Sequence, residues 1–305
     1  MTHTLVLGEA LVDAVTGPEG TTVEHIGGSP ANVAFGLAAL EHQVDLATWI
    51  GADPRGERIA ALCRTRQVTL TRGSQAAAAT SVAHALIRAD GSADYTFELE
   101  WQLPEVPSPA AYSHLHAGSI GAVLEPGASA VRRTLADAHD HATISYDPNV
   151  RPSLMGAPDE ARSAIEGVIR LADVVKLSDE DLAWLYPGRS VPDVLRRLGN
   201  AGPALVVVTQ GSRGVHGLLA RSGEELILPA APVLVVDTVG AGDSFMAGLL
   251  SGLLDAGLLG GSSGRARLAR AGADDISPAL ERALSTAART VSRPGAHAPS
   301  RAELV

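Results

Sequence analysis

An apolar run that leads into a turn of small residues is the feature that most limits what this chain can fold into. Residues 233–236 read Val-Leu-Val-Val, which favours a strand, and Gly240, Ala241 and Gly242 follow shortly afterwards. Residues 244–256 then have the composition of a helix. Backbone amides at such a turn can approach an anion closely, and the helix N-terminus adds a partial positive charge. The segment predicts a strand–turn–helix unit that binds a phosphate.

The acid that follows the turn indicates the chemistry. The carboxylate of Asp243 would repel a phosphate unless it faces the other reactant and removes a proton from an attacking hydroxyl. The segment therefore favours phosphoryl transfer. The alternatives are a purely structural turn and a dinucleotide-binding loop. The dinucleotide pattern Gly-x-Gly-x-x-Gly requires a third glycine that does not follow here, and the Lys-Ser/Thr pair of a P-loop is also missing.

Several blocks of sequence resemble those of the ribokinase-like (PfkB) sugar kinase family, in the family's order. The most specific are residues 237–245, which resemble its C-terminal signature, and residues 27–34, which resemble its Gly-Gly…Asn motif in the form typical of fructokinases. Further matching blocks lie at 147–151, 176–182, 209–214 and 293–296. The resemblance implies a ribokinase-like three-layer α/β/α fold, with a mainly parallel central sheet and a small β-sheet lid, in one kinase domain over residues 1–305.

The alternation of short β-branched or Leu-rich runs with Ala-rich stretches independently favours βαβ units. Strands are expected at residues 4–7, 45–50, 114–117, 144–146, 174–176, 205–209 and 215–219. Helices are expected at residues 31–40, 56–65, 128–138, 159–171, 192–199, 244–256 and 278–291. The Gly- and Ser-rich residues 257–264 are interpreted as a flexible connection that could border the nucleotide pocket.

Two segments, approximately residues 9–26 and 80–102, interrupt this alternation. The second has the pattern of a hairpin around the turn at residues 89–92, Ala-Asp-Gly-Ser. Strands at these places form a lid over the sugar in the resembling family, so we expect a lid, with a plain surface hairpin as the alternative. Tyr95, Phe97 and Trp101 share one face by period-two spacing and would cover the sugar or form a homodimer.

Composition restricts the partners. A formal net charge of -10 over 305 residues disfavours nucleic acid and anionic membranes as partners. The single cysteine, Cys63, cannot form an intramolecular disulfide, and its apolar neighbours favour a buried thiol. The sequence shows neither a signal-peptide pattern nor an apolar stretch of membrane-spanning length, so a cytoplasmic location is expected.

The resemblance implies a set of sugar-binding residues. Asp13 would bind sugar hydroxyls, because a carboxylate accepts bidentately from vicinal diols. Gly27 and Gly28 would let the backbone pass close to the sugar, and Asn32 would hydrogen-bond it, with a helix-start cap as the alternative role for Asn32. Arg151 would contact substrate or phosphate, with a surface ion pair as the alternative.

The resemblance also implies the catalytic and nucleotide-binding residues, with ATP and Mg²⁺ as cofactors. Asp243 would be the general base, and the amides of residues 240–242 would stabilise charge on the γ-phosphoryl oxygens. Ser178 and Asp181 stand where the family has the Asn and Glu of a motif that acts on Mg²⁺ through water, with a helix cap as the alternative role for Ser178. The expected ATP-binding loop contributes Thr209, Gly211 and Gly214.

A K⁺ site beside the anion-binding turn is a further implication of the resemblance. Its expected ligands come from the side chain of Asp237 and from backbone carbonyls near the turn, namely those of Val239, Thr290, Arg293 and Gly295. Other polar residues remain ambiguous: His114 and His116 alternate on one strand and could face a common ligand, whereas Lys176 has no glycine loop beside it in the sequence and is interpreted as structural.

The expected reaction is ATP-dependent phosphorylation of a primary hydroxyl of a sugar, with fructose to fructose 6-phosphate preferred. Ribose, 2-keto-3-deoxygluconate and nucleosides remain open as acceptors. A sugar-binding or regulatory protein that has lost turnover is the alternative of another class. The departures at Ser178 and Asp181 favour that alternative, and the intact residues 240–243 oppose it.

Overall fold

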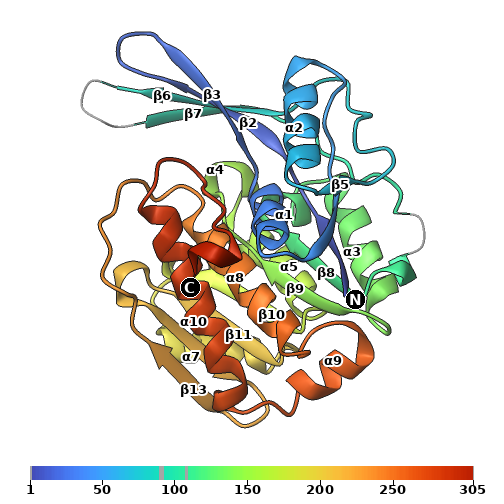
Figure 1. The fold of residues 1–305 in the computed structure, drawn as a ribbon, viewed down its shortest axis with the longest axis vertical. Helices are drawn as coiled ribbons and strands as arrows, with labels where there is room; N and C mark the ends of the chain where they lie inside the picture. Colours follow the sequence, from blue (N-terminus) through green and yellow to red (C-terminus); the bar gives the residue numbers. More distant parts are fainter. Residues whose placement is uncertain (1, 89–92, 107–108, 305) are drawn as a thin grey trace.

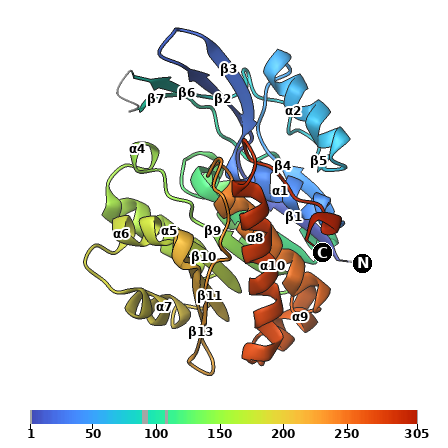
Figure 2. The same ribbon diagram turned by 60° about the vertical axis from the view of Figure 1, so that its left-hand side comes forward.

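The computed structural model describes residues 2–88, 93–106 and 109–304, so the hairpin turn expected at residues 89–92 lies outside the described residues. A nine-stranded sheet lies between two layers of helices, and a four-stranded sheet projects from one end of this core (Figures 1 and 2). The expected α/β fold with a mainly parallel central sheet and a smaller second sheet is therefore confirmed.

The large sheet has the strand order β13-β12-β11-β10-β9-β8-β1-β4-β5. Neighbouring strands from β11 to β5 run parallel, and the pairs β11–β12 and β12–β13 are antiparallel. The strands are β1 His3–Leu7, β4 Gln43–Ala47, β5 Thr69–Leu70, β8 His114–Gly118, β9 Thr143–Asp147, β10 Val174–Ser178, β11 Leu205–Thr209, β12 Val215–Leu219 and β13 Glu224–Leu228. The strand expected at 45–50 is displaced toward the N-terminus, because residues 48–50 already leave the sheet.

Every helix expected from the sequence is present. The helices are α1 Ser29–Ala39, α2 Pro54–Thr65, α3 Gly127–Ala138, α4 Pro152–Met155, α5 Pro158–Ile169, α6 Asp179–Leu185, α7 Val191–Gly199, α8 Ala241–Asp255, α9 Gly261–Leu268 and α10 Ala273–Val291. Within the described ranges, none of them is long and apolar enough to cross a membrane.

Two expectations about helices were wrong. Helix α10 begins at Ala273 rather than at Pro278, because Asp275 caps the backbone N–H of Gly272 and starts the helix earlier, which leaves Pro278 inside it. Residues 261–264 belong to α9 rather than to a flexible loop. Gly260 N–H donates to Thr143 Oγ1 at the start of β9, so this segment lies at the opposite edge of the sheet from the strand ends where a nucleotide is expected.

The strand expected at residues 233–236 does not form. The segment has no regular secondary structure, and its side chains are exposed, Leu234 by 83% and Val235 by 57%. The backbone N–H groups of Val236 and Asp237 donate to the carbonyl of Val291 at the end of α10, and not to a neighbouring strand. The prediction of a strand from this apolar run is wrong, because the side chains face outward and, among the described residues, the backbone pairs with no neighbouring strand.

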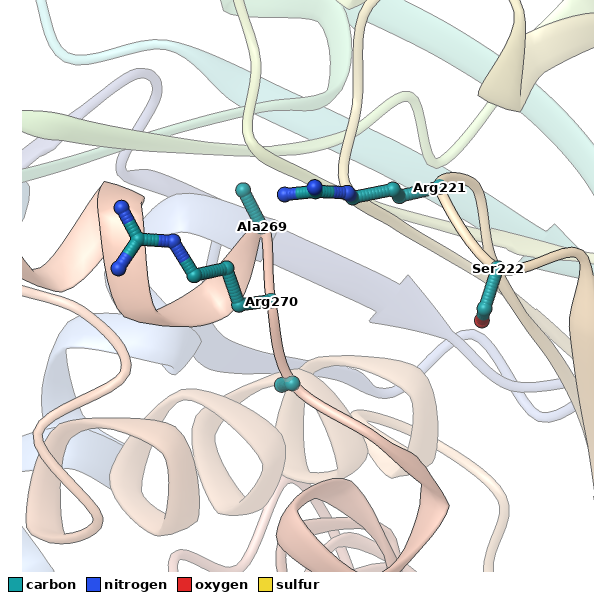
Figure 3. A pocket seen from close by; sticks show the side chains of 5 residues that line it. Arg221, Ser222, Ala269 and Arg270 are labelled. Carbon is teal, nitrogen blue, oxygen red and sulfur yellow. The ribbon is translucent and has the colours of Figure 1, made fainter.

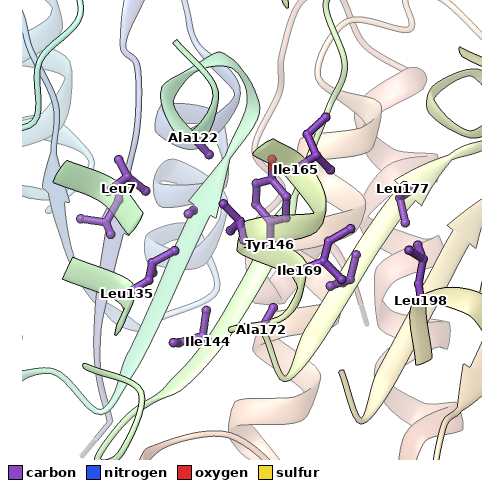
Figure 4. Close-up of a cluster of buried hydrophobic side chains, with 14 of the residues drawn as sticks. Leu7, Ala122, Leu135, Ile144, Tyr146, Ile165, Ile169, Ala172, Leu177 and Leu198 are labelled. Carbon is purple, nitrogen blue, oxygen red and sulfur yellow. The ribbon is translucent and has the colours of Figure 1, made fainter. Parts of the chain in front are cut away.

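The core has one apolar cluster on each face of the large sheet. On one face Leu7, Ile144 and Tyr146 pack against α3, α5 and α7 (Figure 4). On the other face the strands pack against α1, α8 and α10. Cys63 lies buried in this second cluster, where burial raises the pKa of its thiol to about 11, as expected for a structural cysteine.

The small sheet contains the two segments expected to form a lid. Its strands are β2 Leu11–Thr16, β3 Thr22–Gly27, β6 Val82–Ile87 and β7 Ala93–Glu98, in the order β3-β2-β6-β7. Strands β2 and β6 pair in parallel, and the outer pairs are antiparallel. Glu24 on one face binds Arg55 and Arg58 of α2, so α2 covers that face.

The opposite face of the small sheet carries Asp13. Cross-strand partners point to the same side of a sheet, so His25, Ala83 and Phe97 share its row, and a second row holds Val23, Val15, Ala85 and Tyr95. The rings of Tyr95 and Phe97 stack at 6.3 Å. Trp101 does not share this face as expected, because β7 ends at Glu98 and the indole is buried in the core, where Nε1 donates to the carbonyl of Gly121 at 2.9 Å.

Candidate active site

The carboxyl ends of the parallel strands meet at one edge of the large sheet, below the small sheet (Figure 2). Asp147, Ser178 and Thr209 are the last residues of β9, β10 and β11 at this edge. Ligands of open α/β sheets bind outside the carboxyl ends of the strands. Most of the residues expected to act on sugar and nucleotide lie at this edge.

The two most specific sequence motifs meet at Asp243. Its Oδ1 accepts a hydrogen bond of 2.6 Å from Ser29 Oγ, and its Oδ2 accepts one of 2.8 Å from Asn32 Nδ2. Both donors lie in the first turn of α1, whereas Asp243 lies in the first turn of α8. The carboxylate is only 7% exposed, so two helix N-termini fix it in one orientation.

Asn32 does not cap its helix, because the N-cap is Gly28 and no side chain caps α1. Its amide binds Asp243, which leaves the amide oxygen available for another donor. Ser29 was missed in the sequence. Its position between the paired glycines and Asn32, in a motif already assigned to the site, was the signal that could have identified it.

The anion-binding turn has the geometry expected for it. Gly240 adopts a left-handed conformation, with φ of 74°, and α8 begins at the next residue. The amides of the first helical turn have no acceptors within the helix. Ala241 N–H donates to the carbonyl of Thr238 at 3.2 Å, so the turn presents the amide of Gly242 and the positive end of the helix dipole beside Asp243.

Asp13 is half-buried on the inner face of the small sheet. A Cβ atom on Gly27, its neighbour in β3, would collide with the Asp13 carboxylate, and one on Gly28 would lie 2.5 Å from the carbonyl oxygen of Glu9. The two glycines are thus required by packing within the protein. Burial raises the pKa of Asp13, an effect opposed by Arg151 and His25 and reinforced by Asp243.

Arg151 lies close enough to act electrostatically on both Asp13 and Glu9. Its guanidinium donates to Asn149 Oδ1 at 2.8 Å and to nearby backbone carbonyls, rather than to a surface carboxylate. Asn149 itself has a positive φ of 37°. This strained loop holds Arg151 beside the strand ends, a placement typical of functional sites.

The expected nucleotide-binding residues cluster at the ends of β10 and β11. Ser178 and Asp181 form a capping box at the start of α6, so the capping role considered for Ser178 is present. Asp181 also accepts from Val150 N–H at 2.7 Å. Both of its oxygens therefore accept hydrogen bonds from backbone amides.

The loop after β11 contacts the loop that leads to the anion-binding turn. Thr209 Oγ1 donates to the carbonyl of Leu177, and the left-handed Gly211 and Gly214 enclose a short turn. A Cβ atom on Gly214 would collide with the backbone at residues 228–230. The exposed apolar residues 233–236 follow this contact by a few positions, on the loop that leads to the anion-binding turn.

Asp237 joins the two loops expected to hold K⁺. Its Oδ1 accepts from Val239 N–H at 3.0 Å and its Oδ2 accepts from Gly295 N–H at 2.8 Å, and these bonds lower its pKa. Thr290 Oγ1 is buried and donates to Ser244 Oγ. Arg293 pairs with Glu303. The described residues contain no group of three or more His, Cys, Asp or Glu side chains that could hold a metal ion.

A comparison with family models identifies the family of this chain. Residues 1–303 match the model of the pfkB family carbohydrate kinases. The chain belongs to this family. The expected resemblance is confirmed, and with it the expectation of an ATP-dependent carbohydrate kinase.

Several relatives of this pfkB kinase are fructokinases. The fructokinase of Klebsiella pneumoniae is 36% identical over 262 residues, covering 83% of this chain and 85% of that protein. A fructokinase of Xylella fastidiosa with bound ATP superposes with a TM-score of 0.85 at 25% identity, covering 100% of this chain and 97% of that one. A double-mutant fructokinase of Vibrio cholerae with fructose, ADP and potassium ion bound superposes with a TM-score of 0.81 at 25% identity, covering 100% and 97%.

A separate cavity of this pfkB kinase lies far from these residues. It has a volume of about 350 Å³ and is lined by Arg221, Ser222, Ala269, Arg270 and Ala271 (Figure 3). Residues 221 and 222 follow β12, which runs antiparallel to β11, so the cavity borders the edge of the sheet opposite to Thr209. It takes no part in the candidate active site.

Proposed function

We propose that the protein transfers the γ-phosphoryl group of ATP to the 6-hydroxyl of fructose, with Asp243 as the general base. The observation that carries the proposal is the fixed carboxylate of Asp243, held by Ser29 and Asn32 directly beside the amides of an anion-binding turn. The fructokinase relatives support fructose as the acceptor.

In the proposed reaction each group has a role. As the sugar oxygen attacks phosphorus, its proton passes to Asp243, a new O–P bond forms, and the bond to the bridging oxygen breaks so that ADP leaves with the electron pair. The amides of Gly240, Ala241 and Gly242 stabilise charge on the phosphoryl oxygens. Asp13 and the free oxygen of Asn32 orient the sugar hydroxyls, and Arg151 approaches the same side.

Two cations fit the donors at this edge. When bound with ATP, Mg²⁺ neutralises phosphate charge. Ser178 and Asp181 would hold it through water, since the Asp181 carboxylate already accepts two backbone amides. The second site would use the Asp237 carboxylate, which accepts from the N–H groups of Val239 and Gly295, together with the backbone carbonyls of Val239, Thr290, Arg293 and Gly295. Such a donor set carries too little negative charge for a dedicated divalent site and suits K⁺.

The nucleotide would lie along the loop that connects β13 to α8. The expected ATP-binding residues Thr209, Gly211 and Gly214 lie at one end of this loop, and the anion-binding turn lies at the other. Between them Val233, Leu234 and Val235 expose apolar side chains, by 39%, 83% and 57%. An apolar surface leading to a phosphate site matches a base attached to a polyphosphate.

We further propose that residues 1–305 act as one catalytic unit in which the small sheet, approximately residues 9–26 and 80–102, is a lid. Its inner face carries Asp13, which interacts electrostatically with Arg151 and Asp243, and continues into Val23 and Tyr95, exposed by 50% and 60%. This apolar surface would cover the sugar and exclude water, or pair with the lid of a second copy in a homodimer. An enzyme that consumes ATP works where ATP is supplied, so the proposal keeps it in the cytoplasm.

A coupled assay of ADP release over a panel of acceptors tests this function. Fructose should be turned over with the highest kcat/KM, ahead of ribose, 2-keto-3-deoxygluconate and nucleosides. A higher kcat/KM with another acceptor would reassign the substrate. Tight fructose binding without ADP release from any acceptor would instead establish the alternative of a sugar-binding or regulatory protein.

A further inference from the structure

Lys176 is the only lysine of this chain, among 24 lysine and arginine residues in all. It is also buried, with a side chain only 3% exposed on strand β10. Lysine and arginine differ at a buried position, because an ammonium is a compact point charge whereas a guanidinium is a planar fork. The one lysine of a chain that otherwise uses arginine therefore stands at a buried position.

That place is directly beside the anion-binding turn. The Nζ atom lies 2.8 Å from Asp147 Oδ2 at the end of β9. It also lies 3.1 Å from the point that a Cβ atom of Gly242 would occupy. Lys176 therefore does have a glycine turn beside it, although Gly242 lies 66 positions later in the chain.

The surroundings keep the ammonium charged. Burial alone would lower the pKa of Lys176, but the carboxylates of Asp147, Asp181 and Asp243 outweigh burial and raise it. His116 also faces this region, and burial lowers its pKa to about 3, with further lowering from the charges of His114 and Lys176, so its ring is neutral. The ammonium therefore stands among carboxylates, and the imidazole of His116, two strands away, adds no positive charge.

A purely structural role explains these observations poorly. Replacing a buried ion pair by apolar residues of similar volume is often neutral or stabilising, so the pair by itself gives the fold little. The ammonium has three donors, and the hydrogen bond to Asp147 uses one of them. The Nζ atom also lies beside Gly242 in the first turn of α8, so the other two donors are available to a ligand at the turn.

We propose that Lys176 is a catalytic residue that contacts the γ-phosphoryl group during transfer, and that Asp147 holds its ammonium in place beside the turn. The proposal rests on the proposed phosphoryl transfer. Lys176 forms and breaks no covalent bond and keeps its proton, while its charge offsets the negative charge on the non-bridging phosphoryl oxygens. The amides of the turn and this ammonium then act on the same group from adjacent directions.

The affinity for nucleotides with and without a γ-phosphate tests the proposal. In Lys176→Met, binding of a non-hydrolysable ATP analogue, measured by calorimetry, should weaken by about 10- to 100-fold, and kcat should fall by about 10²- to 10³-fold. Binding of ADP should change by less than about threefold. Equal losses for both nucleotides, or an unchanged kcat, would overturn the proposal.

Two further variants separate catalysis from folding. The double variant Lys176→Met/Asp147→Leu removes both charges, so it should fold even if the single variant does not, and it should still discriminate poorly between the ATP analogue and ADP. Recovery of kcat in this double variant would show that the pair is structural. Arg265→Met removes the ion pair with Asp173 at the opposite edge of the sheet and should leave the nucleotide preference unchanged.

The design also separates this inference from the proposed function. If the wild-type protein releases no ADP with any acceptor, the proposed function fails, yet the comparison of ATP analogue with ADP still decides whether Lys176 contacts the γ-phosphate. If the wild-type protein phosphorylates fructose and Lys176→Met keeps both its kcat and its nucleotide preference, only the inference about Lys176 fails.

Discussion

Replacement of Asp243 by Asn separates its chemical role from its structural one. An asparagine has the size of the aspartate and can keep both observed contacts. Its carbonyl oxygen can accept from Asn32 Nδ2, and its NH₂ group can donate to Ser29 Oγ once that hydroxyl rotates. Two charge-assisted hydrogen bonds become neutral ones, which should lower the free energy of unfolding by about 1 kcal/mol. The melting temperature should then fall by about 2 °C.

The effect on catalysis should be much larger. The amide cannot accept the proton of the sugar hydroxyl, so kcat in the ADP-release assay should fall by about 10²- to 10⁴-fold, with fructose affinity nearly unchanged. Ser29→Ala is the matched control, because it removes one donor to the carboxylate but keeps the base, and its kcat should fall by no more than about tenfold. The assigned role of Asp243 is refuted if Asp243→Asn retains more than about a tenth of the wild-type kcat.

Four further outcomes are expected. Gly242→Ala places a methyl group 3.1 Å from Lys176 Nζ and should lower kcat by about three- to tenfold, whereas unchanged kinetics would show that the turn tolerates a side chain. Burial raises the pKa of Glu9 from 4.5 to about 7, so the folded protein holds a proton that the unfolded chain releases, and stability falls as pH rises from about 4.5 to 7. Between pH 5 and pH 8 the free energy of unfolding, measured by denaturant titration, should fall by about 2 to 3 kcal/mol less in Glu9→Gln than in the wild type. The same pH dependence in both proteins would contradict the burial of the charge. If K⁺ binds at Asp237, activity should be about tenfold higher in K⁺ than in tetramethylammonium at matched ionic strength, and equal rates would argue against the site. Phe97→Asp should raise KM for the sugar if the lid covers it, or abolish a dimer in sedimentation if two lids pair. An unchanged KM together with an unchanged sedimentation profile would exclude both roles.

The arrangement of strands and helices was largely predictable from the sequence, because buried parallel strands and amphipathic helices leave distinct patterns. Residues 205–209 are an example: a continuous β-branched run in the sequence is a central strand in the structure. The run at residues 233–236 shows the limit of this reasoning. Hydrophobicity predicts that a side chain avoids water, but it does not tell whether the protein, a ligand or a second chain will cover it.

The candidate site was predictable where motifs are contiguous and not where contacts are distant. Asp243 and Asn32 were identified separately, but their hydrogen bond joins residues 211 positions apart and has no local signal. Ser178 was correctly considered as a cap, because capping residues lie next to the helix they cap. Lys176 was interpreted as structural, since the glycine beside it comes from a segment that only the fold brings near.

The hydrogen bond between Ser29 and Asp243 joins residues 214 positions apart in a chain of 305, and this has a consequence for synthesis. On the ribosome the first helix emerges early and must wait, with its two donors unoccupied, until α8 has been made. If Asp243 is the base, a fragment that ends before α8 lacks it, so a chain terminated or cleaved before that helix should not consume ATP. Enzymatic activity would then report that the chain has been made at least through α8 and that α8 has docked on α1.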